Sequence, residues 1–162
     1  MALNAYLTLK GQKQGDITGS VTEKGRENSI LVHAFNEGIS SPRDPATALP
    51  TGKRQHTPVI ILKEIDRSSP LLRNALINNE NLTTWQLKFW AAGPTGTQMQ
   101  IYTINLTNAN ISSITESMLD NEDPAHANFP LREEVSFVYQ KIQWVWTDGG
   151  ITAQDDWVAP SA

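Results

Sequence analysis

The stretch Met99-Gln-Ile-Tyr-Thr-Ile-Asn-Leu106 shows how the fold is expected to be built. Its apolar side chains stand at odd positions at the start and at even positions from Tyr102 onward. Successive strand residues point to opposite faces, so a change of phase inside a strand indicates a β-bulge or burial on both sides. The same change occurs between Val135 and Trp146, which the pattern predicts to be one long strand. Bulged, bent strands of this kind favour a sheet that closes on itself.

The rest of the chain is also predicted to be mainly β. Residues 3 to 9 alternate apolar and polar side chains, which is typical of a strand with one face on the core. Residues 29–35 and 57–65 are apolar on both phases, so we expect both strands to be covered on both faces. Ser68-Ser69-Pro70 is a helix start, and the apolar stripe behind it predicts one helix over about 69–79. The expected fold is therefore a closed or nearly closed β-barrel with one side helix.

Length and composition limit the possible classes of protein. The chain has 162 residues, which is one domain of ordinary size, predicted to span 1–162 with a flexible tail over 152–162. It has no cysteine, no apolar run long enough to span a membrane and no N-terminal signal pattern. We therefore expect synthesis in the cytoplasm, no membrane insertion, and any export to proceed without a cleavable signal peptide. The net charge of −4 argues against nucleic-acid binding.

Charge is unevenly distributed along the chain. Residues 1–81 hold ten Lys or Arg against eight Asp or Glu, whereas residues 82–162 hold three against nine. This split predicts contacts between unlike surfaces of successive copies, head to tail, although a chance distribution of charged loops explains it equally well.

Residues 37–56 form a loop that is far longer than usual and contains three prolines, which favours a functional role. We predict that it meets an acidic stretch of another copy, at residues 116–134; the alternative is a mobile loop and a merely solubilising stretch. The candidate interface residues are Ser41, Pro42, Arg43, Asp44, Lys53, Arg54 and His56, and Glu116, Asp120, Glu122, Asp123, Glu133 and Glu134.

No motif in the sequence indicates catalysis. The three histidines, His33, His56 and His126, lack metal-ligand spacing, and the serine nucleophile motif is absent. Gly52-Lys53 resembles the end of a phosphate-binding loop. However, the first glycine of that motif is absent five residues before Gly52, and no Ser or Thr follows Lys53. The acidic residues at 120–123 lack the central Gly and terminal Glu of a calcium loop. We therefore expect a protein that is not an enzyme and has no cofactor, no metal and no catalytic residues.

Several features together resemble one known family over residues 3 to about 150. These are the segment Gly15-Asp-Ile-Thr-Gly-Ser20, the run Lys24-Gly25-Arg26, the proline-rich loop, the run Lys63-Glu-Ile-Asp66, the helix start at Ser68, Ser112-Ser113 and the closing Trp144-Val-Trp146. In this combination the chain resembles the Hcp (haemolysin-coregulated protein) family of type VI secretion.

The resemblance implies a subunit of the inner tube of that system. It implies hexameric rings that stack inside a contractile sheath, carry a VgrG-type spike at the tip and are expelled when the sheath contracts. Small effector proteins would be carried in the lumen. From the residues alone, a tail-tube protein of a contractile phage, a monomeric ligand-binding barrel and a small hydrolase stay open as alternatives.

Overall fold

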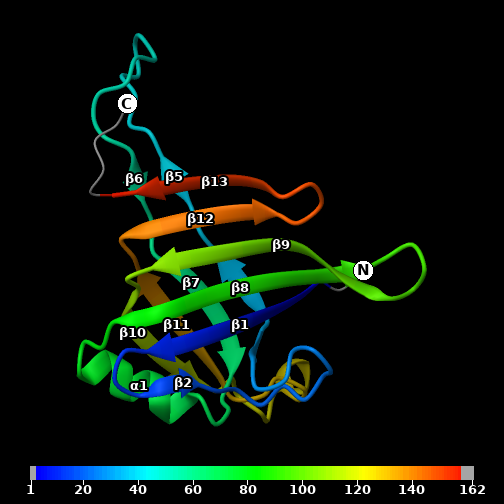
Figure 1. The fold of residues 1–162 in the computed structure, drawn as a ribbon. Coiled ribbons are helices and arrows are strands. Elements are labelled where there is room, and N and C mark those ends of the chain that lie inside the picture. The colour runs from blue at the N-terminus through cyan, green and yellow to red at the C-terminus, as the bar shows by residue number, and fades with distance from the viewer. Residues whose placement is uncertain (1–2, 158–162) are drawn as a thin grey trace.

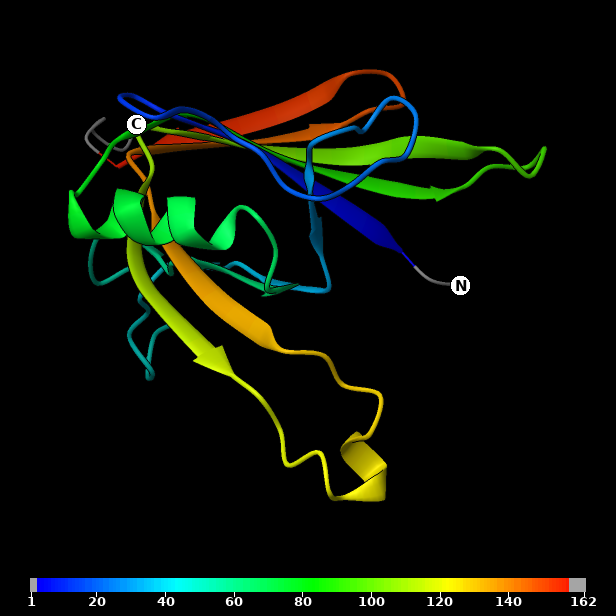
Figure 2. The same ribbon diagram turned by 90° about the horizontal axis from the view of Figure 1, so that it is seen from below.

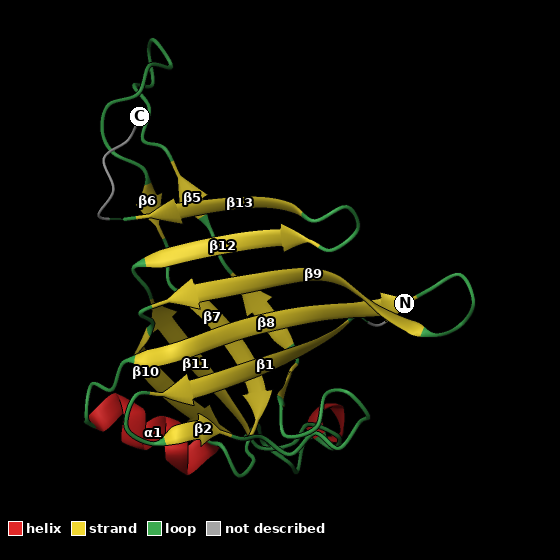
Figure 3. Ribbon diagram, viewed as in Figure 1, coloured by secondary structure: helices red, strands yellow, loops and turns green. Residues whose placement is uncertain are grey.

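The computed structural model describes residues 3–157. These residues form mainly antiparallel strands, with one α-helix and one short 3-10 helix (Figure 3). The strands are β1 (Asn4–Gly11), β2 (Gly15–Ile17), β3 (Ile30–Val32), β4 (Ala34–Asn36), β5 (Ile39–Ser40), β6 (Gln55–His56), β7 (Val59–Glu64), β8 (Leu82–Ala92), β9 (Gln98–Thr107), β10 (Asn110–Ser117), β11 (Arg132–Val138), β12 (Lys141–Trp146) and β13 (Ile151–Asp156). The helices are α1 (Ser69–Ile77) and η1 (Pro124–His126).

The strands form two main sheets. The large sheet has the order β13-β12-β9-β8-β1-β2, with β3 also paired to β1, and the small sheet has the order β10-β11-β7-β4 (Figure 1). β5 and β6 form a separate pair. The predicted class, mostly β with one helix at the side, is therefore confirmed. Closure into a barrel is not seen, because no hydrogen-bonded ladder among the described strands joins the edges of the two main sheets.

The chain passes from one sheet to the other at sharp corners. β3 belongs to the large sheet and β4 to the small one, with only His33 between them. Likewise β9 leads into β10 at Asn108, which has a φ of 50°. Asn tolerates this left-handed conformation better than most residues, so it suits a position where a strand must turn abruptly. These corners hold the two sheets face to face.

The change of phase in residues 99–106 comes from a bulge. Phe89 pairs with Tyr102 and Trp90 pairs with Gln100, so Ile101 is the extra residue in β9. Of the two explanations for this change of phase, a bulge and burial on both sides, the bulge is the one found. The prediction of one long strand from Val135 to Trp146 is wrong, because β11 lies in the small sheet and β12 in the large sheet. The change of phase within residues 135–146 marks the point where the chain leaves the small sheet and enters the large one.

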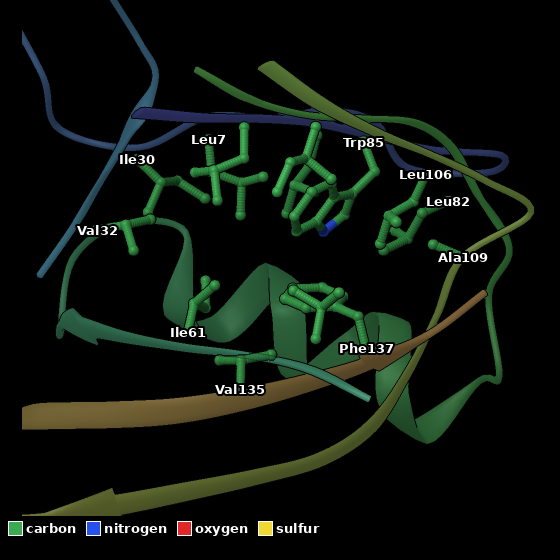
Figure 4. Close-up of a cluster of buried hydrophobic side chains, with 14 of the residues drawn as sticks. Leu7, Ile30, Val32, Ile61, Leu82, Trp85, Leu106, Ala109, Val135 and Phe137 are labelled. Atoms are coloured by element: carbon green, nitrogen blue, oxygen red, sulfur yellow. The ribbon is translucent and has the colours of Figure 1, made fainter. Parts of the chain in front are cut away.

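The core lies between the two sheets (Figure 4). Trp85 from β8 meets Phe137 from β11 edge to face, with ring centroids 5.4 Å apart. Leu7 of β1 and Ile61 of β7 are fully buried beside them. An edge-to-face pair contributes about 0.5–1.5 kcal/mol beyond its buried area. This aromatic contact therefore joins the two sheets at their centre.

Three other predictions are corrected by the structure. The helix ends at Ile77, two residues early, and Asn79 follows it with a φ of 48°. The segment 29–35 is not covered on both faces, because Leu31 is exposed. The tail expected to be flexible over 152–162 begins inside a strand, since β13 pairs with β12 along its length. Residues 158–162 lie outside the described part.

Candidate interfaces between subunits

The long loop is a structured arm. Its base is the β5–β6 pair, where Ile39 faces His56, and an isolated bridge joins Arg43 to Pro50 further out. We call residues 41–54 the arm; it projects from the end of the molecule near β13 (Figure 1). Among the predicted residues, Ser41, Arg43 and Lys53 are exposed, while Pro42 and Asp44 are half-buried.

Backbone hydrogen bonds fix the shape of the arm. Asp44 Oδ1 accepts from the amides of Ala46 at 2.7 Å and Thr47 at 3.1 Å, and these bonds hold the pKa of Asp44 below its ordinary value. The Thr51 amide donates to the carbonyl of Pro42 at 3.0 Å. A carboxylate that caps a turn in this way removes backbone freedom. The arm is therefore partly ordered before it meets any partner.

The base of the arm is bound to β13 by an ionic cluster that the sequence pattern did not reveal. Arg54 Nε donates to Asp155 Oδ2 at 2.5 Å, and His56 Nε2 lies 2.6 Å from the same oxygen. His56 is buried, and its Nδ1 lies 3.2 Å from Tyr139 Oη. Arg54 Nη2 also donates to the Asp156 carbonyl at 2.8 Å. Arg54 and His56 therefore anchor the arm within their own subunit.

The electrostatics of this cluster follow from its geometry. The hydrogen bond from Arg54 lowers the pKa of Asp155, with a smaller contribution from His56 and against the opposing effect of burial. Burial raises the pKa of the Tyr139 hydroxyl, and the charges of Glu37 and Asp155 raise it further. Asp155 therefore stays ionised under ordinary conditions and Tyr139 stays neutral. These bonds make the cluster a structural clamp between the arm and β13.

The predicted acidic stretch divides into an exposed and a buried part. Asp120, Glu122 and Asp123 are exposed in the connection between β10 and β11, and Glu134 is exposed on β11. Glu116 is exposed too and pairs with Arg73 Nη2 of α1 at 2.9 Å. Glu133 is fully buried and binds Lys63 inside the subunit, so we no longer place it among the interface residues.

The arm and the exposed acidic connection lie at opposite ends of the molecule. In Figure 1 the arm is at the top, and the connection with η1 is at the bottom. Figure 2 shows the β10–β11 connection extending well away from the sheets. Exposed apolar side chains accompany the acidic ones there, including Met118, Leu119 and Phe129. The structure therefore does not bring the two candidate groups together within one copy.

Within residues 3–157, no three His, Asp or Glu side chains are placed so that they could hold a metal ion. None of the helices in that range is long and apolar enough to cross a membrane.

The chain matches known proteins along nearly its whole length. The family model for the type VI secretion system effector Hcp matches residues 6–146. The Major exported protein of Pseudomonas aeruginosa PAO1 is 39% identical to the chain, and the alignment covers 100% of the chain and 99% of that protein.

Solved structures share the fold. A crystal structure of an Hcp protein superposes with a TM-score of 0.90 at 26% identity, covering 98% of this chain and 100% of that one. The Hcp1 protein of the E. coli EAEC 042 pathovar has a TM-score of 0.85 at 33% identity, covering 96% of this chain and 99% of that one. The secreted protein Hcp3 of Pseudomonas aeruginosa has a TM-score of 0.80 at 32% identity, covering 98% of this chain and 100% of that one. The chain therefore belongs to the Hcp family of type VI secretion proteins.

Proposed function

We propose that this chain is the inner-tube subunit of a type VI secretion system. In this role it forms hexameric rings, and the rings stack into a tube inside a contractile sheath. The tube carries a VgrG-type spike and leaves the cell when the sheath contracts, with small effector proteins held in the lumen. The subunit is made in the cytoplasm and exported without a cleavable signal, and its role is structural and not enzymatic.

The observation that carries the proposal is the placement of unlike surfaces at opposite ends of one rigid subunit. The arm presents Arg43 and Lys53, whereas the far end presents Asp120, Glu122 and Asp123. Stacking of identical rings brings the top of one copy against the bottom of another, which is a heterologous contact. Each exposed ion pair contributes only about 0.2–1 kcal/mol. Repetition around a ring multiplies this small contribution.

The clamp at the base of the arm supports the same function. An arm that is already ordered loses less conformational entropy when it contacts the next ring. Arg54, His56 and Asp155 hold the arm to β13 and so aim it in one direction. A stacking contact that must survive rapid expulsion benefits from this rigidity.

Negative-stain electron microscopy of the purified chain tests the proposal. We expect rings with six-fold symmetry and a central hole, and short stacks at high protein concentration. Particles of the size of a single 17.9 kDa subunit, with no rings at any concentration, would refute the tube function.

A further inference from the structure

The large sheet extends beyond the small sheet at one end (Figure 2). Apolar side chains from both sheets line a groove there. The groove has a volume of about 430 Å³. Its walls come from Leu3, Phe35, Phe89, Ile101, Tyr102, Ile104 and Trp146. Leu3 and Trp146 are about half exposed, at 53% and 48%. Exposed apolar surface of this kind marks a site that a partner covers.

One carboxylate stands in this apolar wall. Glu37 lines the groove; its Oε2 accepts from Trp144 Nε1 at 3.4 Å. Its Oε1 is shielded from solvent and has no hydrogen-bond partner among residues 3–157. The pKa of Tyr102 is raised by burial and, in second place, by the charge of Glu37. The groove therefore combines aromatic walls with an uncompensated negative charge.

This combination selects its occupant. A neutral apolar side chain that covered the groove would bury Glu37 more deeply and leave its Oε1 without a partner, which is costly. An occupant with a cation would pair with Glu37 and also meet the aromatic faces, which attract cations. The groove therefore favours a segment that presents an apolar side chain next to a Lys or Arg.

Helix α1 presents such a pair at the other end of the molecule. Arg73 and Ile77 are four residues apart and so lie on one face of the helix. The Arg73 side chain is 42% exposed and Ile77 is 75% exposed. Arg73 Nε and Nη2 bond to Glu116 Oε1, and a guanidinium with five N–H donors can serve a second carboxylate as well.

The positions of the two surfaces fit a ring. In Figure 1, α1 lies at the left end of the strands, while β1 and β9 begin and β8 and β12 end at the right. Most of the groove residues belong to these four strands or stand next to them. A closed ring needs two different faces on opposite sides of each subunit. We propose that the groove around Glu37 receives the Arg73–Ile77 face of α1 from the neighbouring copy. This inference rests on the proposed ring assembly and specifies which faces meet within a ring.

A charge exchange tests the pairing. Glu37→Lys and Arg73→Glu should each weaken ring association at least tenfold, as measured by sedimentation across a dilution series. The double variant Glu37→Lys/Arg73→Glu should recover most of the association, because the pair is restored with reversed signs. Glu27→Gln is the control, since it removes an exposed carboxylate from a loop that belongs to neither face and should leave ring association unchanged.

The outcomes separate this inference from the proposed function. If the parent forms no rings, the tube function fails. If the parent forms rings and the single variants also do, or if the double variant recovers nothing, the pairing of Glu37 with Arg73 is wrong while the ring stands. If a charge-exchanged subunit does not fold by circular dichroism, Glu37→Gln and Arg73→Gln replace it. The double neutral variant should then be no weaker than either single one, and additive losses would overturn the pairing.

Discussion

Lys63 Nζ lies 2.5 Å from Glu133 Oε1, and both side chains are fully buried between the small sheet and α1. Ser69 Oγ at the start of α1 donates to the same carboxylate oxygen at 2.9 Å, and Asp66 Oδ1 lies 3.1 Å from Lys63 Nζ. The ion pair therefore connects β7 and β11 to the first turn of the helix. The sequence pattern placed Glu133 on a surface, and the structure places it at an internal joint.

The first prediction concerns this buried ion pair. Glu133→Gln should lower the free energy of unfolding by about 3–5 kcal/mol, because it removes the closer of the carboxylates that pair with the buried Lys63 ammonium and leaves Asp66 at its other side. The measurement is urea unfolding at neutral pH and a fixed protein concentration, because assembly also stabilises the fold. The double variant Lys63→Met/Glu133→Leu removes both charges and should lose less than the single variant. An equal loss from both would contradict this account.

The second prediction concerns Gly19. A Cβ at this position would lie 2.3 Å from the Ser29 carbonyl oxygen and 2.8 Å from Ile30 Cα, and backbone cannot move aside easily. Gly19→Ala should therefore destabilise the subunit by about 1–3 kcal/mol, as expected for overpacking. Gly52→Ala in the arm is the matched control, because nothing lies within 4 Å of its added Cβ. Thermal unfolding of the two variants side by side checks the difference, and an unaffected Gly19→Ala would be incompatible with the close approach.

The third prediction is that the arm separates from β13 in strong acid. The pKa of Asp155 is lowered in the folded state, so its contribution to stability is complete above its unfolded value of about 3.9 and is lost as pH falls through the lower folded value. Amide hydrogen exchange in residues 41–54, corrected for the intrinsic effect of pH, should show protection near neutrality and a loss of protection in strong acid. Asp155→Asn should reduce this protection already at neutral pH.

Glu27→Gln serves as the control for that experiment. The pKa of Glu27 is also lowered, by backbone hydrogen bonds including one from the Gly25 amide, but it lies in a different loop. The Glu27→Gln variant should therefore leave the amides of the arm protected from exchange. Arm exchange that is the same in the parent and in Asp155→Asn would show that the clamp does not hold the arm.

The fourth prediction concerns stacking. Lys53 is exposed on the arm, so Lys53→Glu should leave the subunit folded and the rings intact. Stacks should become fewer and more sensitive to salt, because exposed charges are screened within about 10 Å at 0.1 M ionic strength. Light scattering across a salt series measures the change. Adding Asp120→Lys and Glu122→Lys to that variant should restore stacking, whereas equal stacking by all variants at low and high salt would exclude these charges from the joint.

The sequence predicted the local features of the fold better than its long-range contacts. The bulge at Ile101 is one of the two readings that the change of phase allowed, and the helix starts at Ser69 as the serines and Pro70 indicated. Ser68 was expected to cap the helix but makes no side-chain capping hydrogen bond. The junction at Tyr139 and Gln140 was missed, because apolar residues on both sides of it continue as if the strand did not end. Periodicity shows which face a residue takes and does not show to which sheet the strand belongs.

The candidate site shows the same limit. Lys53 and Asp120 were expected on the surface and lie there, since polar connecting segments are seldom buried. Arg54 and Asp155 are 101 residues apart in sequence, so no local pattern could pair them. Nothing in the sequence distinguished Glu37 from other loop residues, because its place in an apolar groove depends on how the two sheets pack.

Closure of the subunit into a six-membered ring can be tested by the mass of the purified chain in solution. Size-exclusion chromatography with multi-angle light scattering should give about six times the subunit mass of 17.9 kDa, as a closed cyclic assembly requires. A subunit that stays monomeric from micromolar to millimolar concentration would contradict the account.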